Sequence, residues 1–347
     1  MKKALVIRLG AFGDMLIITP ELKKLKELGY YVFLNTGKRG MDVFKNNPNV
    51  DEYVIYDDEK PPESLEKYWD GIKARIDPDL FINFSESLEC NVALHPIQPE
   101  YNYTKAERYA LANKNYYDAT EDWLRDKAVF KGEPEVFHGF QKVPELFFTE
   151  EEKDEARGLI KAGKFNVLWQ LSGSAKQKVY PWTDFVIGEV LKNYDNIHFI
   201  TTGDERCQML ESMSDPGITN LSGRIPVRTA MCLTQFVDLV IAPDTGILHA
   251  SGCYETPKIG ILGHTSKVNI TAYFKNDYSL EAICACAPCF RLIYDFDIQC
   301  PIELVSHAAW CMAEGIKPER LYDAIAARAE VGGYYRRVDA GKEAGIS

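Results

Sequence analysis

Short runs of branched apolar residues, each followed by a turn and a helical pattern, recur along both halves of the chain. The first run, Ala4–Arg8 (ALVIR), ends in the glycine-containing turn Leu9–Asp14 and leads into a helical pattern over Met15–Leu28, with Pro20 marking a boundary near its start. Runs of this kind are typical of strands buried on both faces of a parallel sheet. The order of strand, turn, helix and strand therefore predicts a doubly wound α/β lobe. Further strands are expected at Tyr31–Asn35, Tyr53–Tyr56 and Leu80–Asn83.

The same order of elements begins again near residue 150. Thr149 and Glu152 form a predicted capping box at the start of a helix. Asn166–Leu171 is then the first strand of a new series, and a loop with Gly and Ser follows it. The later elements of this series are a helix at Phe185–Leu191 and strands at His198–Thr201, Leu239–Ala242 and Ile259–Leu262.

The two series predict two domains. The chain has 347 residues, which is long for a single hydrophobic core. Two facing lobes leave a ligand cleft between them, at the carboxyl ends of the strands. The predicted units are an N-terminal lobe over residues 1–155, a C-terminal lobe over residues 156–325, and a terminal helix or tail over residues 326–347.

The composition is that of an acidic globular protein. A net charge of −11 argues against a partner that is nucleic acid, because such binding needs a basic surface. Arg8 and Asp14 interrupt the apolar run at the N-terminus that would otherwise resemble a signal peptide. We expect a cytoplasmic protein with at most peripheral contact at the inner face of the membrane. Nine cysteines are then expected as thiols or metal ligands rather than disulfides.

Residues 86–135 form a polar, aromatic stretch with weak periodicity, for which only short helices and loops are expected. One interpretation is that its aromatic side chains simply pack. The other is that the stretch is an insertion that binds a substrate. The aromatic residues concerned are Tyr101, Tyr103, Tyr109, Tyr116, Tyr117 and Trp123.

Gly13 and Asp14 close the turn after the first predicted strand. A carboxylate at the mouth of a strand–turn–helix unit faces the cleft, which suits a general base. An aspartate in this position also suits a purely structural role, in which it complements the dipole of the following helix. The local pattern leaves both interpretations open.

The loop Gly173–Lys178 follows the first strand of the second series. Small residues such as Ser174 let backbone N–H groups approach a phosphate, and Lys178 supplies a positive charge. A solvent-exposed loop with two lysines is the structural alternative.

The segment Asp244–His249 also follows an apolar strand and opens a helix. Thr245 and Gly246 place backbone donors at the helix start, where a diphosphate is favoured. Asp244 is expected to orient these groups or to bind a sugar hydroxyl. His249 lies one turn further on, where it reaches the phosphate or packs.

A cluster of cysteines near the C-terminus is a candidate metal site. Cys286 and Cys289 form a C-x₂-C pair that Cys300 and Cys311 follow, and Cys284 adds a fifth thiol. Four thiolates can hold zinc or iron in a tetrahedral structural site that leaves no catalytic position. Free buried cysteines are the alternative.

Together these segments resemble glycosyltransferase family nine, the ADP-heptose:lipopolysaccharide heptosyltransferases. The likeness runs from Met1 to about Ile325. The segments that carry it are ALVIRLGAFGDMLIITPELKKLK, NPNVDEYVIY, AKQKVYPW, APDTGILHASG, TPKIGILG, and CAPCF…CP…CM with IKPERLYDAI.

The resemblance implies a GT-B fold, with an N-terminal acceptor lobe, a C-terminal donor lobe and a final helix that crosses back to the first. It implies an inverting enzyme that needs no metal for transfer. Asp14 would deprotonate the acceptor hydroxyl, and Lys178 would neutralise the leaving diphosphate. The donor-binding residues would be Gly13, Ser174, Asp244, Thr245, Gly246 and His249.

We therefore expect transfer of a sugar, in the first instance heptose from ADP-heptose, to a carbohydrate acceptor such as lipopolysaccharide core. Related autotransporter heptosyltransferases hold iron on cysteines and modify protein hydroxyls, which implies a structural metal and a protein acceptor as further expectations. Two alternatives remain: a nucleotide-sugar epimerase on the same scaffold, and a non-catalytic sugar-nucleotide-binding protein with a metal–cysteine site. A Rossmann dehydrogenase is disfavoured because no G-x-G-x-x-G follows a strand.

Overall fold

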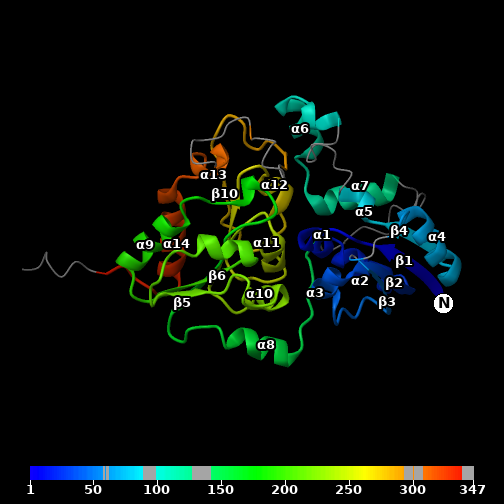
Figure 1. The fold of residues 1–347 in the computed structure, drawn as a ribbon, viewed down its shortest axis with the longest axis horizontal. Helices are drawn as coiled ribbons and strands as arrows, with labels where there is room; N and C mark the ends of the chain where they lie inside the picture. The colour runs from blue at the N-terminus through cyan, green and yellow to red at the C-terminus, as the bar shows by residue number, and fades with distance from the viewer. Residues whose placement is uncertain are drawn as a thin grey trace, which may run out of the picture.

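A computed structural model of the protein describes residues 1–57, 59, 62–88, 99–126, 142–292, 300 and 308–337. Two α/β lobes lie side by side, the first in blue and cyan and the second in green to red (Figure 1). Each lobe is built on a parallel sheet. The predicted two-lobed α/β architecture is confirmed.

The first lobe has a parallel sheet with the strand order β3-β2-β1-β4 among the described residues. Ile7 of β1 is in register with Asn35 on one side and with Asn83 on the other. Alternate side chains of β1 enter different layers, so that Ala4 packs on one face and Leu5 on the other. Burial of both faces explains the uninterrupted apolar run in the sequence. The strands are β1 (Lys2–Ile7), β2 (Tyr30–Gly37), β3 (Glu52–Tyr56) and β4 (Leu80–Asn83).

The helical pattern after β1 forms two helices rather than one. The first ends at Ile17 and the second begins at Thr19, with Pro20 in its first turn. Proline is tolerated there because a first-turn N–H has no partner within the helix. The helices of this lobe are α1 (Phe12–Ile17), α2 (Thr19–Glu27), η1 (Lys38–Gly40), α3 (Met41–Phe44) and α4 (Leu65–Ile76).

The second lobe has a parallel sheet with the order β10-β9-β8-β5-β6-β7 among the described residues. Alternation again separates two layers, because Leu168 of β5 faces the first lobe and Trp169 faces the opposite side. Both side chains are fully buried. The strands are β5 (Phe165–Gln170), β6 (Ile197–Thr202), β7 (Ile218–Asn220), β8 (Leu239–Pro243), β9 (Lys258–Leu262) and β10 (Leu280–Glu281).

The predicted capping box at Thr149 is present and opens the connecting helix α8. The Thr149 N–H donates to Glu152 Oε2 at 2.9 Å, and the Glu152 N–H donates to Thr149 Oγ1 at 3.3 Å. The expected lobe boundary between residues 155 and 156 falls inside this helix. The helices from here on are α8 (Glu150–Arg157), η4 (Lys176–Lys178), α9 (Thr183–Asn193), η5 (Glu205–Leu210), α10 (Val227–Leu233), α11 (Gly246–Ser251), α12 (Lys267–Ile270), α13 (Trp310–Ala313) and α14 (Pro318–Val331).

The last described helix stays with the second lobe. Helix α14 packs against α9, with Leu321 and Ile325 in the core between them. The chain continues along α9, where the Arg337 N–H donates to the Asn193 carbonyl at 2.8 Å. Residues 338–347 of the predicted crossing segment lie outside the described residues.

The tyrosine-rich stretch forms an arm, residues 99–126, that reaches from the second lobe, beside α6, back to the first lobe, where α7 packs against α5 (Figure 1). The side chain of Asn269 donates to the carbonyls of Ala112 and Lys114 at 3.3 and 2.8 Å. Tyr116 and Tyr117 are buried in a core cluster that both lobes share. Packing therefore accounts for these two tyrosines, whereas residues 89–98 and 127–135 lie outside the described part. The elements of this region are α5 (Ser85–Leu88), η2 (Pro99–Asn102), α6 (Lys105–Ala112) and α7 (Tyr116–Asp126).

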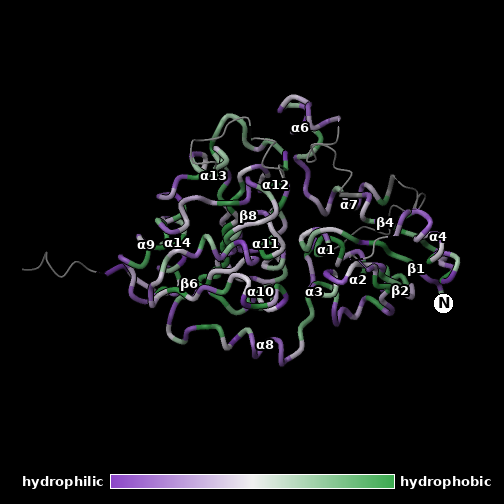
Figure 2. The backbone as a smooth tube through the Cα atoms, viewed as in Figure 1, coloured by the Kyte–Doolittle hydropathy of each residue, from purple (hydrophilic) through white to green (hydrophobic). Residues whose placement is uncertain are grey.

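The hydrophobic segments of the chain are concentrated in the strands of the two sheets, whereas α8 is mostly hydrophilic (Figure 2). Among the helices that the structure describes, none combines the length and the apolar character needed to cross a membrane.

Glu21 in the first turn of α2 is a buried carboxyl group whose pKa is raised to about 8. Burial is the main cause, and the nearby Glu121 carboxylate adds to it. Between its ordinary pKa of 4.5 and about 8, the folded protein retains a proton that the unfolded chain has lost. The free energy of unfolding should therefore fall as the pH rises through this window, by about 1.4 kcal/mol per pH unit.

The variant Glu21→Gln should remove this contribution and be more stable than the wild type at the upper end of the window. Urea unfolding of both proteins between about pH 5 and 8 measures the difference. An identical pH dependence in the two proteins would contradict the prediction.

Candidate active site between the two lobes

The turn after β1 places a carboxylate at the edge of the first sheet. Gly10 has a φ angle of 109°, which glycine adopts without strain and which turns the chain from β1 toward α1. Asp14 is the third residue of α1, and its side chain is 31% exposed. The carboxylate therefore remains accessible from the cleft.

A buried guanidinium holds this carboxylate. Arg8 is fully buried, and its Nη2 lies 3.0 Å from Asp14 Oδ2. Its Nη1 donates to the carbonyl of Phe84, just beyond β4, at 3.0 Å. Removing the partner of a buried charge is costly, so this pair fixes the orientation of Asp14. This role of Arg8 was not predicted, although a charged residue directly after a buried strand is a usable sequence signal.

A cavity of about 270 Å³ lies beside the same turn. The Arg39 guanidinium stands 4.8 Å from the centre of the Phe12 ring, next to this cavity. The space thus combines apolar walls with one cation. Its lining residues are Leu9, Gly10, Met15, Gly37 and Arg39.

A larger hollow, about 430 Å³, lies between α9 and the start of β6. Its described lining includes none of the site residues predicted from the sequence. We therefore place the candidate site at the smaller cavity and the loops that face it.

The two predicted phosphate loops of the second lobe lie against each other. Lys178 Nζ, on the first loop, stands 3.5 Å from Asp244 Oδ2 on the second. A Cβ atom on Gly173 would come within 2.7 Å of Lys178 Cδ and 2.8 Å of Thr245 Cγ2. The absence of a side chain at Gly173 thus allows this close approach. Ser174 is exposed on the same loop.

These loops leave the carboxyl ends of β5 and β8. The two strands are neighbours at the point where the strand order of the second sheet changes direction. Ligands in open α/β sheets bind outside such a switch point. The topology therefore places Lys178 and Asp244 where a ligand is expected.

Asp244 is buried among three cationic or titratable groups. His249 Nε2 lies 3.3 Å from Asp244 Oδ1, and His264 Nε2 lies 3.7 Å from Asp244 Oδ2. Burial alone would raise the pKa of Asp244, but Lys178 and His249 hold it below its ordinary value. Asp244 is therefore a carboxylate that organises its neighbours.

His264 was not recognised from the sequence. It follows β9 and is 2% exposed. Burial, together with the nearby Lys178, lowers the pKa of His264 to about 4. Neither of its ring nitrogens, nor Nδ1 of His249, has a hydrogen-bond partner among the described residues. A polar residue directly after a buried strand was the available signal.

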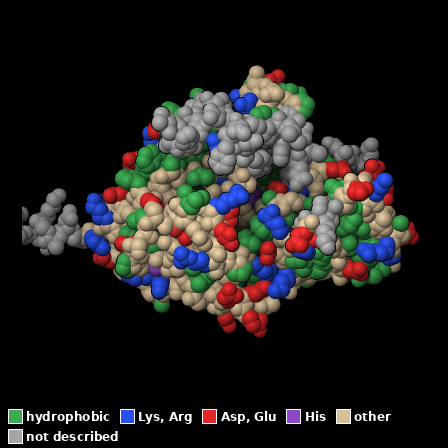
Figure 3. All heavy atoms as spheres, viewed as in Figure 1, with side chains coloured by type: hydrophobic (Ala, Val, Ile, Leu, Met, Phe, Trp, Pro, Cys, Tyr) green, Lys and Arg blue, Asp and Glu red, His purple; other side chains and the backbone are tan. Residues whose placement is uncertain are grey.

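The two halves of the site meet at α1 and α11. A Cβ atom on Gly13 would stand 2.8 Å from His249 Cδ2, and one on Gly246 would stand 2.6 Å from Phe12 Cβ. Glycine at both positions allows the backbones of the two lobes to touch. On the face shown in Figure 3, basic and acidic side chains lie together along this junction. The structure thus brings Gly13 and Asp14 against the group around Asp244.

The cysteine loop lies near α13, and its Phe290 N–H donates to the carbonyl of His264 at 2.9 Å. Cys284 Sγ and Cys286 Sγ are 3.5 Å apart. Burial raises the pKa of Cys311, and the nearby Cys289 and Cys286 thiols add to this effect. The described part of the chain contains no group of three His, Cys, Asp or Glu side chains arranged to hold a metal ion. It contains no disulfide either.

The arm from the first lobe docks on this cysteine loop. Lys105 Nζ donates to the carbonyls of Ala285 and Ala287 at 2.9 and 2.7 Å. Arg108 Nε donates to the carbonyl of Cys289 at 2.7 Å. The lobes are therefore joined above the cleft as well as at α1 and α11. Local sequence patterns could not predict these contacts, because the partners are far apart in the chain.

Two facing parallel α/β lobes, with a carboxylate on one and a lysine-containing loop on the other, form the GT-B architecture. The sequence profile of glycosyltransferase family 9 (heptosyltransferase) matches residues 94–296, more than half of the chain. The protein belongs to this family and is a glycosyltransferase. No curated protein sequence matches the chain.

Several solved structures share the fold. The family 9 glycosyltransferase from Veillonella parvula is 14% identical, with a TM-score of 0.65, and the match covers 95% of this chain and 98% of that one. The ADP-heptose lipopolysaccharide heptosyltransferase II of E. coli is 13% identical, with a TM-score of 0.64 and coverages of 96% and 100%. The iron-containing dodecameric glycosyltransferase TibC of enterotoxigenic E. coli is 11% identical, with a TM-score of 0.58 and coverages of 95% and 77%.

Proposed function

We propose that this protein transfers heptose from ADP-heptose, with inversion, to a carbohydrate acceptor such as lipopolysaccharide core. The observation that carries the proposal is the contact of the Asp14 helix α1 with α11 across the lobe junction, next to Asp244, which pairs with Lys178. Two comparisons support the donor: heptosyltransferase II of E. coli bears ADP-heptose in its name, and TibC was solved with ADP-D-β-D-heptose.

The proposed reaction is a single displacement. The Asp14 carboxylate accepts the proton of the acceptor hydroxyl, and the acceptor oxygen forms a bond to the anomeric carbon. The bond from that carbon to the phosphate oxygen breaks, and its electron pair leaves with the diphosphate. Arg8 keeps the Asp14 carboxylate in place during this step.

The departing diphosphate gains charge and needs fixed donors and cations around it. In this proposal Lys178 supplies the cation, and Thr245 and Gly246 supply backbone N–H groups. Asp244 orients Lys178 and His249, and Ser174, exposed on the Lys178 loop, would contact the donor. The cavity beside Gly10 and Arg39 would admit the acceptor.

The test is a donor panel on the purified protein. Nucleotide sugars, including ADP-heptose, are incubated with and without lipopolysaccharide-core acceptor, and released nucleoside diphosphate is quantified. We expect ADP release that depends on the acceptor. Conversion of the sugar without acceptor would favour the epimerase alternative. Donor binding without turnover would favour the non-catalytic alternative.

We also propose that the cysteine loop takes up a structural metal ion through Cys286, Cys289, Cys300 and Cys311. The support is the donor set: Cys311 lies near Cys286 and Cys289, and thiolates suit zinc or iron. In the described part of the chain these thiols are not arranged around an ion, so metal binding would draw them together. Such an ion would fix the loop on which the arm docks. It would take no part in transfer.

Purified protein should accordingly contain about one zinc or iron atom per chain by elemental analysis. The variant Cys289→Ser should lose most of this metal and melt at a lower temperature than the wild type. The variant Cys207→Ser, a buried cysteine of η5 in the second lobe, serves as the control and should retain the metal. Metal-free wild-type protein with an unchanged melting temperature after chelation would contradict this proposal.

A further inference from the structure

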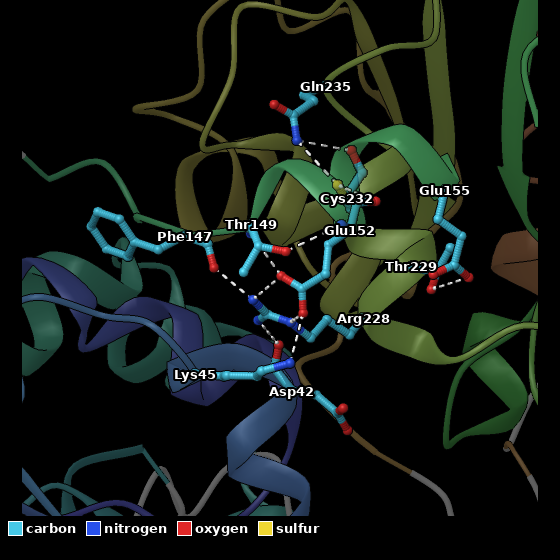
Figure 4. Close-up of polar contacts among 10 residues, drawn as sticks. All are labelled: Asp42, Lys45, Phe147, Thr149, Glu152, Glu155, Arg228, Thr229, Cys232 and Gln235. Carbon is cyan, nitrogen blue, oxygen red and sulfur yellow. Dashed lines mark hydrogen bonds and ion pairs between the residues drawn. The ribbon is translucent and has the colours of Figure 1, made fainter. Parts of the chain in front are cut away.

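A third contact between the lobes is centred on one guanidinium group (Figure 4). Arg228 of α10 is 7% exposed. Its Nη1 donates to the carbonyl of Asp42 in α3 at 2.8 Å. Its Nη2 donates to the carbonyl of Phe147, in the segment that leads out of the first lobe, at 2.6 Å. One side chain thus joins the second lobe to the first lobe and to the connection between them.

The connecting helix α8 completes this contact. Arg228 Nε and Nη2 donate to the two carboxylate oxygens of Glu152 at 2.8 and 2.9 Å. Lys45 Nζ, at the end of α3, donates to Glu152 Oε1 at 2.9 Å. Paired, fork-like bonds of this kind fix geometry as well as supplying energy. We call this set, formed by Asp42, Lys45, Phe147, Glu152 and Arg228, the interlobe clamp.

The clamp contains a hydrogen-bonded ion pair between Arg228 and Glu152. The hydrogen bonds from Arg228 and the contact with Lys45 lower the pKa of Glu152 to about 2, although burial by itself would raise it. The Arg228 guanidinium also stands 4.5 Å from the centre of the Phe148 ring. The three guanidinium nitrogens therefore all donate hydrogen bonds, and their partners come from α3, α8 and the segment before α8.

The helices that carry the clamp also contact the helices that carry the candidate site. Helix α3 packs against α1, which bears Asp14, and α10 packs against α11, which follows Asp244. The pairs α1–α11 and α3–α10 thus cross the lobe junction together. A displacement at the α3–α10 contact therefore also moves the α1–α11 contact, because packed helices transmit displacements.

We propose that Arg228 is a positioning residue for sugar transfer: through the interlobe clamp it holds the Asp14 turn at its working distance from the Lys178 and Asp244 loops. This inference rests on the proposed function. Arg228 itself touches neither donor nor acceptor. Its effect should therefore appear in the turnover rate and not in the affinity for the nucleotide, which the second lobe binds.

The structure offers a matched control on the same two helices. Thr229 Oγ1 donates to Glu155 Oε1 at 3.2 Å, next to the clamp in Figure 4. That bond joins α8 to α10 and does not reach the first lobe. The variant Glu155→Gln keeps an acceptor for Thr229 and removes one charge, so it tests whether a change of charge at the α8–α10 contact has the same effect.

The experiment compares wild-type protein with Arg228→Ala, Arg228→Lys and Glu155→Gln. Turnover of ADP-heptose with lipopolysaccharide-core acceptor, ADP affinity by calorimetry, and small-angle X-ray scattering are measured for each. We expect kcat to fall about 100-fold in Arg228→Ala, as for a misplacement on the scale of an ångström. Arg228→Lys should be intermediate, because it keeps the charge but loses the fork. Glu155→Gln should match the wild type, and ADP affinity should be unchanged in all variants.

Scattering should show a larger radius of gyration for Arg228→Ala than for wild type and Glu155→Gln. If Arg228→Ala does not fold, Arg228→Lys alone carries the comparison. Wild-type turnover in the arginine variants, or equal losses in Glu155→Gln, would overturn the inference. A rate loss explained by weaker ADP binding would overturn it too. If the wild type transfers no sugar, the proposed function fails, and scattering still decides whether Arg228 sets the lobe arrangement.

Discussion

Replacement of Asp14 by Asn is expected to abolish sugar transfer while ADP binding is retained. The amide cannot accept the proton of the acceptor hydroxyl, and loss of a positioned general base costs about 10²- to 10⁴-fold in rate. The side chain is near-isosteric, so the contact between α1 and α11 should survive. Turnover of ADP-heptose in the presence of lipopolysaccharide-core acceptor measures the rate, and calorimetry with ADP measures binding.

The same substitution leaves the buried guanidinium of Arg8 without its anionic partner. A loss of stability of about 1–3 kcal/mol is therefore expected in addition, and thermal unfolding would detect it as a lower melting temperature. The control is Asp70→Asn, on exposed α4, where the carboxylate contacts Lys73 at 2.6 Å. Near-wild-type turnover of a folded Asp14→Asn protein would show that another group is the base.

Replacement of Lys178 by Met should lower kcat about 10²- to 10³-fold, which is the range for loss of one preorganised group that stabilises developing charge. In the proposed reaction the departing diphosphate loses its nearest cation. The substitution also leaves the buried Asp244 with only His249 and His264 as close partners. The acceptor-dependent release of ADP is again the measurement.

Two further variants of the 3₁₀ turn η4 serve as controls for the Lys178→Met prediction. Lys178→Arg keeps the charge in a different shape and should recover part of the rate. Lys176→Met removes the other lysine of η4 and should have little effect. Equal losses in the Lys176 and Lys178 variants would indicate a general charge effect on the loop, and the assigned role of Lys178 would be wrong.

Most of the strands and a few of the helices could be predicted from local patterns. Pro20 correctly marked a helix boundary, and the Thr149–Glu152 capping box is present as predicted. These features depend on hydrogen bonds and steric contacts between residues only a few positions apart, so the local sequence is enough to predict them. The catalytic and donor-binding roles of the predicted residues remain predictions, although the structure places Gly13 and Asp14 against the loops of Lys178 and Asp244.

The contacts of the arm and the burial of Arg8 and His264 were not predicted. Arg108 bonds to Cys289, which is 181 residues away, and no periodicity links the two. Arg8 appeared only as an interruption of an apolar run, because its partner at Phe84 lies on another strand. Such pairings depend on strand order and lobe contact, which one segment alone does not encode.

By itself, then, the sequence determined the repeated strand–turn–helix units and the loops at their carboxyl ends, because backbone geometry and side-chain periodicity act over a few residues. Only the tertiary structure decided that these loops face each other. It did so through glycines at positions 13 and 246, where any side chain would hold the lobes apart, and through Arg228, whose partners come from three segments. The physical reason is that close packing and buried charge pairing are satisfied only when distant parts of the chain meet.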